Sequence, residues 1–255
     1  MDILFTGTGA SEWAPENRFK SNYRRKSSLL IDGTLMIDAG PDIFTFEKDF
    51  SYNRLYSGVK AILQTHSHRD HLSEDSLREL VKENSKCMIL GDTVTLESIK
   101  NIDGLQKIAT EPYLTSDICG YAVTPLKSNH TLGLVNEQPL HYIIEKNGKR
   151  IFYGCDGAWL LYPTWAHMKK LSFDLMILDG TTGELDGNIR NFEHNNLAMV
   201  RLLATTFREN NLLTNKGKIM ISHMAMSLHG SHKDLEDRLG ANEVQPAFDG
   251  MQIKV

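Results

Sequence analysis

A cluster of three histidines and one aspartate constrains this chain more than any other feature. Residues 66–71 read His-Ser-His-Arg-Asp-His and follow the apolar run 61–65, which predicts a strand. With ten histidines in 255 residues, such a cluster would arise by chance on the order of once in a thousand chains. Imidazole and carboxylate groups are ligands for zinc, manganese and iron, and a cluster without cysteine favours a catalytic over a closed structural site. We therefore predict a metal site at the end of this strand.

The alternative interpretation is a solvated polar loop that caps the next helix. Residues 73–84 do predict a helix, with Ser73 as N-cap and acidic Glu74 and Asp75 in its first turn. However, four crowded histidine and aspartate side chains would be costly if protonated and contribute little to packing. Metal binding is the favoured interpretation.

Short apolar runs alternate with helical patterns along the whole chain, without a repeat or a low-complexity tract, which predicts one domain over residues 1–255. Asp32-Gly33 and Asn147-Gly148 predict tight hairpins, the first between strands 28–31 and 34–38 and the second between strands 140–145 and 150–153. The other predicted elements are strands 2–5, 61–65, 175–179 and 219–222 and helices 73–84, 159–170 and 197–209. This mixture predicts an α/β fold with two sheets and outer helices, a four-layer αββα sandwich.

Charge and cysteine content limit the expected partners and cellular compartment of the chain. The formal net charge of -4 offers no uniform positive field, so nucleic acid is a less favoured partner. Three cysteines without a short Cys-x-x-Cys spacing argue against a disulfide framework and indicate the cytoplasm. Because there is no signal-peptide pattern and no apolar run of 18 residues, we expect no association with membranes.

The histidine cluster resembles the signature of the metallo-β-lactamase superfamily, His-x-His-x-Asp-His after a strand, followed by a distant His, Asp and His. The resemblance runs the length of the chain and implies the αββα sandwich of that family. The three distant positions are matched, in the right order, by Ser128-Asn129-His130, Gly154-Cys155-Asp156-Gly157 and Ile221-Ser222-His223.

The resemblance implies a centre with two divalent ions per chain, zinc or manganese, with iron as a third candidate. The implied ligands of one ion are His66, His68 and His130, those of the second are Asp70, His71 and His223, and Asp156 would bridge the two. Asp38 is expected to orient a ligand. Two ions about 3.5–4 Å apart share a water, lower its pKa and present hydroxide as a nucleophile at neutral pH.

Within the superfamily, three stretches resemble a branch of phosphodiesterases that opens phosphoribosyl 1,2-cyclic phosphate: residues 23–28, residues 247–253 and Asn191-Phe192-Glu193-His194. This resemblance implies a small phosphodiester substrate. It gives His194 the role of general acid, and His194 and Asp70 are the expected catalytic residues. We expect the chain to form a homodimer.

Three alternatives stay open at this point. A tRNA 3′ endonuclease shares the ligands, but only 25 residues separate His130 from Asp156, too few for a long arm that would hold tRNA. A lactone or thioester hydrolase also shares them. A metal-holding scaffold without catalysis is disfavoured because every ligand position of the superfamily is filled.

Several basic residues keep two interpretations each. His229 and His232 either line a phosphate pocket or lie in a charged surface loop, and the run Arg24, Arg25 and Lys26 either contacts a phosphate or forms a solvated face. The isolated His141 and His167 are interpreted as structural.

Overall fold

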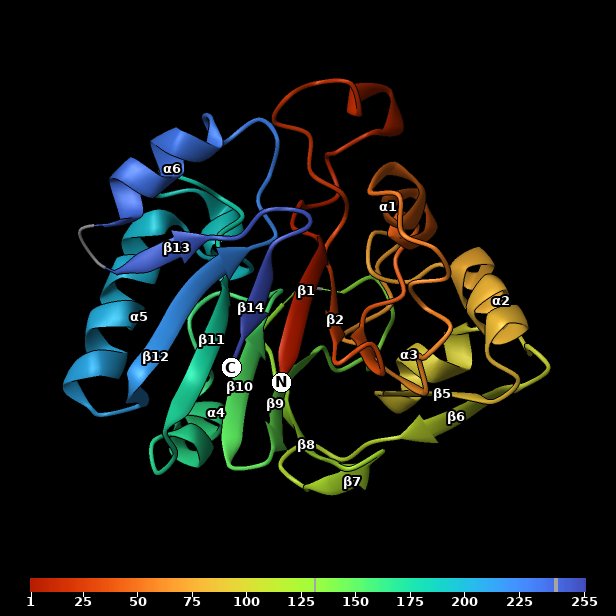
Figure 1. Cartoon of the computed structure of the whole chain (residues 1–255). Coiled ribbons are helices and arrows are strands. Elements are labelled where there is room, and N and C mark those ends of the chain that lie inside the picture. Colours follow the sequence, from red (N-terminus) through yellow and green to blue (C-terminus); the bar gives the residue numbers. More distant parts are fainter. Residues whose placement is uncertain (131, 241–242) are drawn as a thin grey trace.

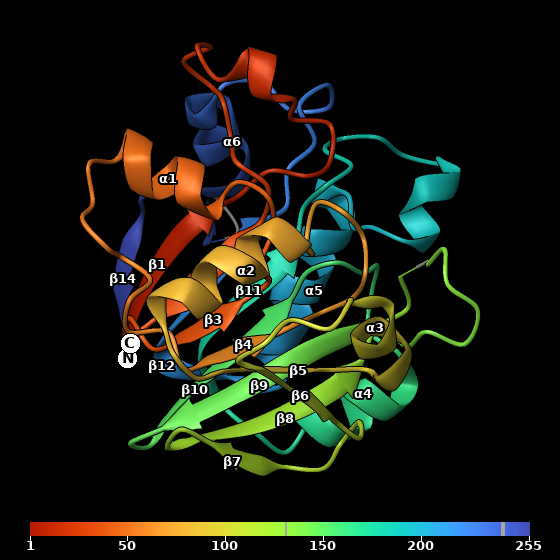
Figure 2. The ribbon, with the colours of Figure 1, turned by 90° about the vertical axis from the view of Figure 1, so that its right-hand side faces the viewer.

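The computed structural model of the chain describes residues 1–130, 132–240 and 243–255. Two seven-stranded sheets lie face to face, and helices cover the outer face of each (Figures 1 and 2). The predicted α/β, four-layer αββα sandwich is confirmed.

The first sheet has the order β14-β1-β2-β3-β4-β5-β6. Its strands are β1 (Asp2–Gly7), β2 (Ser28–Ile31), β3 (Leu35–Ile37), β4 (Ala61–Leu63), β5 (Cys87–Gly91), β6 (Leu105–Ala109) and β14 (Gln252–Lys254). The helices on its outer side are α1 (Ile43–Asp49), α2 (Glu74–Glu83) and α3 (Thr93–Ser98). Antiparallel pairing joins β14, β1, β2 and β3, whereas β3 to β6 are parallel.

The second sheet has the order β13-β12-β11-β10-β9-β8-β7. Its strands are β7 (Ser116–Ile118), β8 (Tyr121–Lys127), β9 (Leu140–Lys146), β10 (Lys149–Gly154), β11 (Phe173–Asp179), β12 (Leu213–Ser222) and β13 (Val244–Pro246). Its helices are α4 (Tyr162–Met168), α5 (Leu197–Glu209) and α6 (His232–Leu239), and two short 3₁₀ helices, η1 (Pro15–Asn17) and η2 (Ile189–Phe192), lie in loops.

Three apolar cores separate the four layers. Side chains alternate along the strands, so Leu175 and Ile177 of β11 enter the core between the sheets, while Met176 and Leu178 enter the core under the helices. A third core fills the space between the first sheet and its helices. Alternate side chains of the buried strands therefore supply the apolar cores on both faces of the second sheet.

Both predicted hairpins are present, and their turn residues explain them. Asp32, Gly33, Asn147 and Gly148 all have positive φ, between 50° and 72°, as tight hairpin turns require. The expected strands 34–38 and 61–65 end earlier, at Ile37 and Leu63, because the residues beyond them are committed to the network around Asp38 described below.

The prediction of a helix over 159–170 is wrong at its start. The helix begins at Tyr162, with Pro163 in its first turn, where proline is favoured. Trp159 has φ 56° and lies in a left-handed turn outside the helix.

The strands bring their polar ends to one edge of the sandwich. His66 lies beyond the end of β4, His130 beyond β8, Asp156 beyond β10, Asp179 at the end of β11 and His223 directly after β12. These are the loop positions at which a rigid scaffold holds reactive groups.

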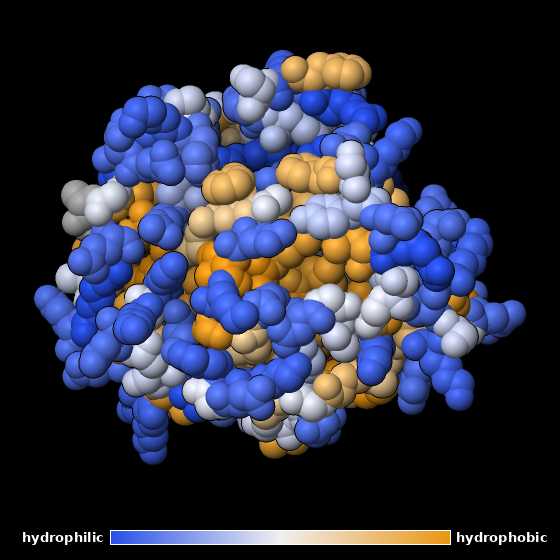
Figure 3. All heavy atoms as spheres, in the orientation of Figure 1, coloured by the Kyte–Doolittle hydropathy of each residue, from blue (hydrophilic) through white to orange (hydrophobic). Residues whose placement is uncertain are grey.

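One face of the molecule carries an apolar area over the β14 and β1 edge of the first sheet (Figure 3). A hollow of about 520 Å³ lies there, and its lining includes Leu4, Leu30 and Ile253 but no candidate ligand. Among the helices of the described residues, none is long and apolar enough to cross a membrane.

Candidate metal centre

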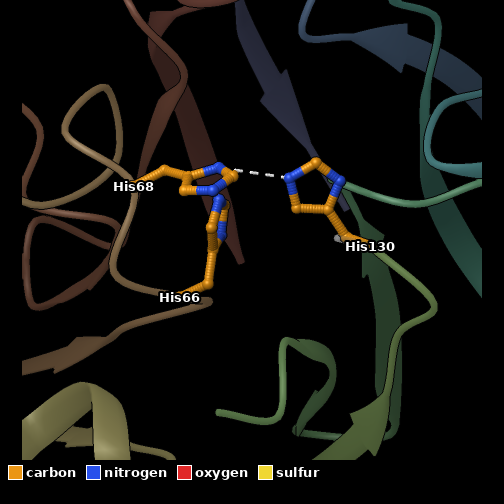
Figure 4. A group of neighbouring side chains, drawn as sticks. All are labelled: His66, His68 and His130. Carbon is orange, nitrogen blue, oxygen red and sulfur yellow. Dashed lines mark hydrogen bonds between the residues drawn. The ribbon is translucent and has the colours of Figure 1, made fainter. Parts of the chain in front are cut away.

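The first ligand set, His66, His68 and His130, gathers its ring nitrogens at one point (Figure 4). One nitrogen of each lies within 4.8 Å of the others, and His68 Nδ1 is 3.2 Å from His130 Nε2. His66 is fully buried, yet its Nε2 has no hydrogen-bond partner among the described residues. These nitrogens face one another as they would around a cation.

The second ligand set, Asp70, His71 and His223, lies beside the first. His71 Nε2 is 3.1 Å from His223 Nε2, and Asp70 Oδ2 is 3.5 Å and 3.4 Å from these two atoms. All three side chains are buried. Asp70, expected as both ligand and catalytic residue, therefore contacts the ligand histidines.

Asp156 lies between the two sets. Its Oδ2 is 3.7 Å from the Nε2 atoms of His66 and His130 and 3.2 Å from that of His71. Its Oδ1 is 2.8 Å from His223 Nδ1. One carboxylate thus contacts both sets, the position that a bridging ligand requires.

The electrostatics of the cluster fit a bound cation. Burial lowers the pKa of His130 to about 4, and burial together with the charge on His71 lowers the pKa of His66, so both are neutral donors. Burial also opposes charge on His71, but Asp156 and Asp70 outweigh it and raise the pKa of His71. A divalent ion would replace such protons as the partner of the buried carboxylates. The donors, imidazole nitrogens and carboxylate oxygens alone, suit zinc, manganese or iron.

Asp38 contacts the candidate ligands, as expected for a residue that orients them. Its Oδ2 is 2.7 Å from His71 Nδ1, and its Oδ1 accepts from the Thr65 backbone N–H at 2.8 Å. The Thr65 hydroxyl contacts Asp38 and lies 2.8 Å from His66 Nδ1. Asp38 therefore fixes a ring in each ligand set.

Sequence reasoning missed three residues that position the cluster. Thr181 Oγ1 lies 2.7 Å from His223 Nδ1, and Asp179, fully buried, accepts from the Thr181 hydroxyl at 3.0 Å. Glu137 accepts from the Ser67 backbone N–H at 2.7 Å. Asp179 at its strand end gave a weak signal, whereas Thr181 and Glu137 lie in loops without a pattern.

His194 lies against both ligand sets. Its ring centroid is 4.8 Å from that of His130 and 5.5 Å from that of His223. Its Nδ1 is 2.8 Å from Asp179 Oδ2, and its Nε2 forms no hydrogen bond with the described residues. Burial lowers the pKa of His194, but the charge and hydrogen bond of Asp179 outweigh burial and raise it. The predicted catalytic histidine is thus brought to the cluster.

Two surface interpretations are wrong. Arg24 and Arg25 do not form a solvated face, because each is only 7% exposed. Arg25 forms ion pairs with Asp49 and Asp249. His229 is not in a solvated loop, because its Nε2 lies 2.8 Å from the Gly180 carbonyl oxygen and burial lowers its pKa.

Of the three remaining histidines, two pack within the fold and the third contacts Arg24. His141 is buried and lies 3.0 Å from the Asp156 carbonyl oxygen through its Nε2, which agrees with a structural role. His167 packs near the Tyr113 ring, at a centroid distance of 5.9 Å. His232 is half-buried beside Arg24.

Comparison with solved structures gives relatives that match over essentially the whole chain. Zn²⁺-bound PqqB from Methylobacterium extorquens has a TM-score of 0.78 at 17% identity and covers 100% of both chains. A diphosphatase from the PhnP family has a TM-score of 0.76 at 18% identity and covers 100% of this chain and 97% of its own. The short form of human tRNase Z has a TM-score of 0.69 at 18% identity, with 100% and 99% covered. These similarities establish the fold.

A comparison with curated proteins gives no match. The family model described as the beta-lactamase superfamily domain matches residues 34–214, most of the chain, and the matched segment includes six of the seven candidate ligands. The fold, the histidine signature and this match agree. The chain therefore belongs to the metallo-β-lactamase superfamily.

Proposed function

We propose that this chain is a dinuclear metal-dependent phosphodiesterase that opens a small cyclic phosphodiester, with phosphoribosyl 1,2-cyclic phosphate as the specific substrate. One observation carries the proposal: His194, which belongs to neither ligand set, lies against both and is held by a buried carboxylate. Opening a cyclic ester of a sugar hydroxyl expels an alkoxide, which needs a proton as the bond to phosphorus breaks.

The seven ligand candidates would hold the two ions, zinc or manganese with iron as a third candidate. When bound, two such ions activate a water as nucleophile and neutralise charge that develops on the phosphoryl oxygens. The solved relative with bound Zn²⁺ supports zinc for this fold. The chain's own residues then have to orient the ester and deliver a proton.

We assign the delivery of that proton to His194. Its Nδ1–H donates to Asp179, which fixes the ring and stabilises its charged form, and Nε2 remains for the leaving oxygen. Asp179 is itself held by the Thr181 and Asn195 backbone N–H groups at 2.9 Å and 3.1 Å. Asp179 acts as a positioning residue for the acid.

The size of the substrate is inferred from the segment between His130 and Asp156. Most of that segment is the β9–β10 hairpin, whose strands belong to the second sheet, so it is not a projecting arm that would hold tRNA. The net charge of -4 agrees with a small substrate rather than a polyanion. The solved relatives include both a diphosphatase and a tRNase Z, so the choice depends on these features of the chain.

The His194→Ala variant tests the proposal. With phosphoribosyl 1,2-cyclic phosphate, we expect the rate to fall about 10²- to 10⁴-fold, because the alkoxide loses its proton donor. With bis(p-nitrophenyl) phosphate, whose leaving group needs no proton, the loss should be much smaller. Rates on the two substrates are compared for the metal-loaded wild type and variant.

Metal content is measured in the same samples, because His194 also lies near Glu193 and His130 in a possible ligand arrangement. Unchanged metal content with the selective loss supports the acid. Equal losses on both substrates, or loss of metal, would contradict that role. A wild type that cleaves a lactone or thioester but no phosphodiester would overturn the proposed function.

A further inference from the structure

Arg24 is a buried cation without a carboxylate of its own. Its side chain lies in the segment between β1 and β2 and is 7% exposed. Its Nη1 donates to Thr8 Oγ1 at 2.8 Å and to the Ala247 carbonyl oxygen at 2.7 Å. Among the described residues it forms no ion pair, and Asp249 nearby is bonded to Arg25 through both the backbone and the side chain. The charge of Asp249 acts on Arg24 through space, but no carboxylate of the described residues is hydrogen-bonded to the Arg24 guanidinium, and a buried charge without a direct partner is costly.

The guanidinium retains two adjacent donors. Its Nη2 lies 3.2 Å from His232 Nδ1, which has to accept because a guanidinium only donates. Of the five N–H groups, two on Nη1 and one on Nη2 have partners, and within the described part of the chain Nε–H and one Nη2–H have none. When Nε–H and the Nη2–H on the same side are both free, that edge of a guanidinium can bind two oxygens of one phosphate.

His232 carries a further donor close to the guanidinium. Because the Nδ1 of His232 accepts from Arg24, its Nε2 carries the proton. The carboxylate of the exposed Glu236 lies 3.5 Å from this Nε2 atom. The His232 ring packs edge-on against Phe248, which is 45% exposed, so the group reaches the surface.

This cluster lies next to the metal centre. The Thr8 carbonyl oxygen accepts from the Met224 backbone N–H at 2.9 Å, and Met224 directly follows the ligand candidate His223. In both ribbon views the segment after β1 and helix α6 lie at the same edge of the sandwich (Figures 1 and 2). A ligand with two anionic groups could therefore reach both sites.

We propose that Arg24 and His232 bind a second anionic group of the substrate, a phosphate monoester on the sugar that carries the reacting cyclic phosphate. This inference rests on the proposed function and deepens it, because it makes the enzyme selective for phosphorylated sugars over plain cyclic phosphodiesters. The buried guanidinium then has a directly bonded anion in the complex.

The test compares two substrates that differ only in this group, phosphoribosyl 1,2-cyclic phosphate and ribosyl 1,2-cyclic phosphate. The Arg24→Met variant should lower kcat/KM for the first about 10- to 100-fold, the effect of losing a charged hydrogen bond, and change the second less than about 3-fold. His232→Gln should act in the same direction with a smaller effect. The control Thr8→Val removes one structural bond of Arg24 and leaves its charge, so it should preserve the preference for the phosphorylated substrate.

Equal losses of Arg24→Met on both substrates would overturn the second site and leave Arg24 a structural role. If the wild type turns over neither substrate, the proposed phosphodiesterase function fails. The anion site at Arg24 and His232 is then tested by a binding measurement. Metal-loaded wild type should then bind ribose 1,5-bisphosphate more tightly than ribose 1-phosphate, and Arg24→Met should abolish that difference. The same preference in wild type and variant would contradict the site.

Discussion

Four of the five imidazoles that are candidate ligands have one ring nitrogen in contact with a fixed partner. The Nδ1 atoms of His66, His71, His130 and His223 lie against the Thr65 hydroxyl, the Asp38 carboxylate, the Glu193 carbonyl oxygen and the Thr181 hydroxyl. Such contacts set the ring orientation and leave the other nitrogen to the metal. The geometry of the centre therefore depends on the residues that contact the candidate ligands as well as on the ligands themselves.

Replacing Asp38 tests this at the residue scale. Asp38→Ala removes the partner of His71 Nδ1 and of Thr65, so we expect metal affinity to fall about 10- to 100-fold, as is usual for residues that orient ligands. The affinity is measured by competition with a chelator for the purified protein.

Asp38→Asn is the matched control. It keeps the volume and one acceptor oxygen, so its loss of affinity should be smaller. If both variants bind metal as tightly as the wild type, Asp38 only supports the fold.

The candidate ligands could be predicted from the sequence because four of them form one short signature and the others follow in a fixed order. Asp179 and Glu137 could not, because their roles depend on loops that meet only in the folded chain. Arg24 shows the same limit: a run of basic residues carries no sign that Arg24 is buried against Thr8, Ala247 and His232, which are distant in the sequence.

At the scale of elements, the loop after β4 is held by a loop from the other sheet. Glu137, between β8 and β9, accepts from the Ser67 backbone N–H and hydroxyl, both at 2.7 Å, and from the Thr95 hydroxyl of α3 at 2.6 Å. Ser67 lies between His66 and His68. Glu137 thereby fixes the direction of the loop that carries both histidines.

Glu137→Ala should weaken metal binding about 10-fold, since the histidine loop loses a charged acceptor for its backbone. Glu137→Gln keeps one acceptor oxygen and should lose less. Chelator competition reports the affinity, and circular dichroism checks that the fold is kept. An Ala variant with wild-type affinity would show that the loop is rigid without Glu137.

Helices and strands with a clear local sequence pattern could be predicted. Strands that exist only because they pair with a neighbouring strand could not. The helix over 197–209 and the strand 28–31 have the predicted bounds, because their helical spacing and hairpin turn are local. β5 was missed because a short apolar run does not distinguish strand from buried helix. The edge strands β13 and β14 have three residues each and are recognised only by their pairing.

At the scale of the whole molecule, each ligand set takes residues from both sheets. His66, His68, Asp70 and His71 come from the first sheet, and His130 and His223 from the second. Binding at either set therefore stabilises the packing of one sheet on the other, because the ions bind the folded chain and not the unfolded one.

Metal removal should lower the melting temperature. An ion at a thousand times its Kd adds about 4 kcal/mol to the free energy of unfolding, which for a chain of this size corresponds to roughly 8–16 °C. Differential scanning calorimetry with and without a chelator measures the shift. His66→Ala/His223→Ala is the control and should be insensitive to the chelator, whereas a wild type equally insensitive would contradict metal binding.

The supply of ligands from both sheets has a kinetic consequence. An ion held by residues of two sheets would tie the two layers together at that edge, so removing it should let this edge open more often. Amide hydrogens at the ends of β4 and β12 should then exchange with solvent faster in the metal-free protein than in the metal-loaded protein.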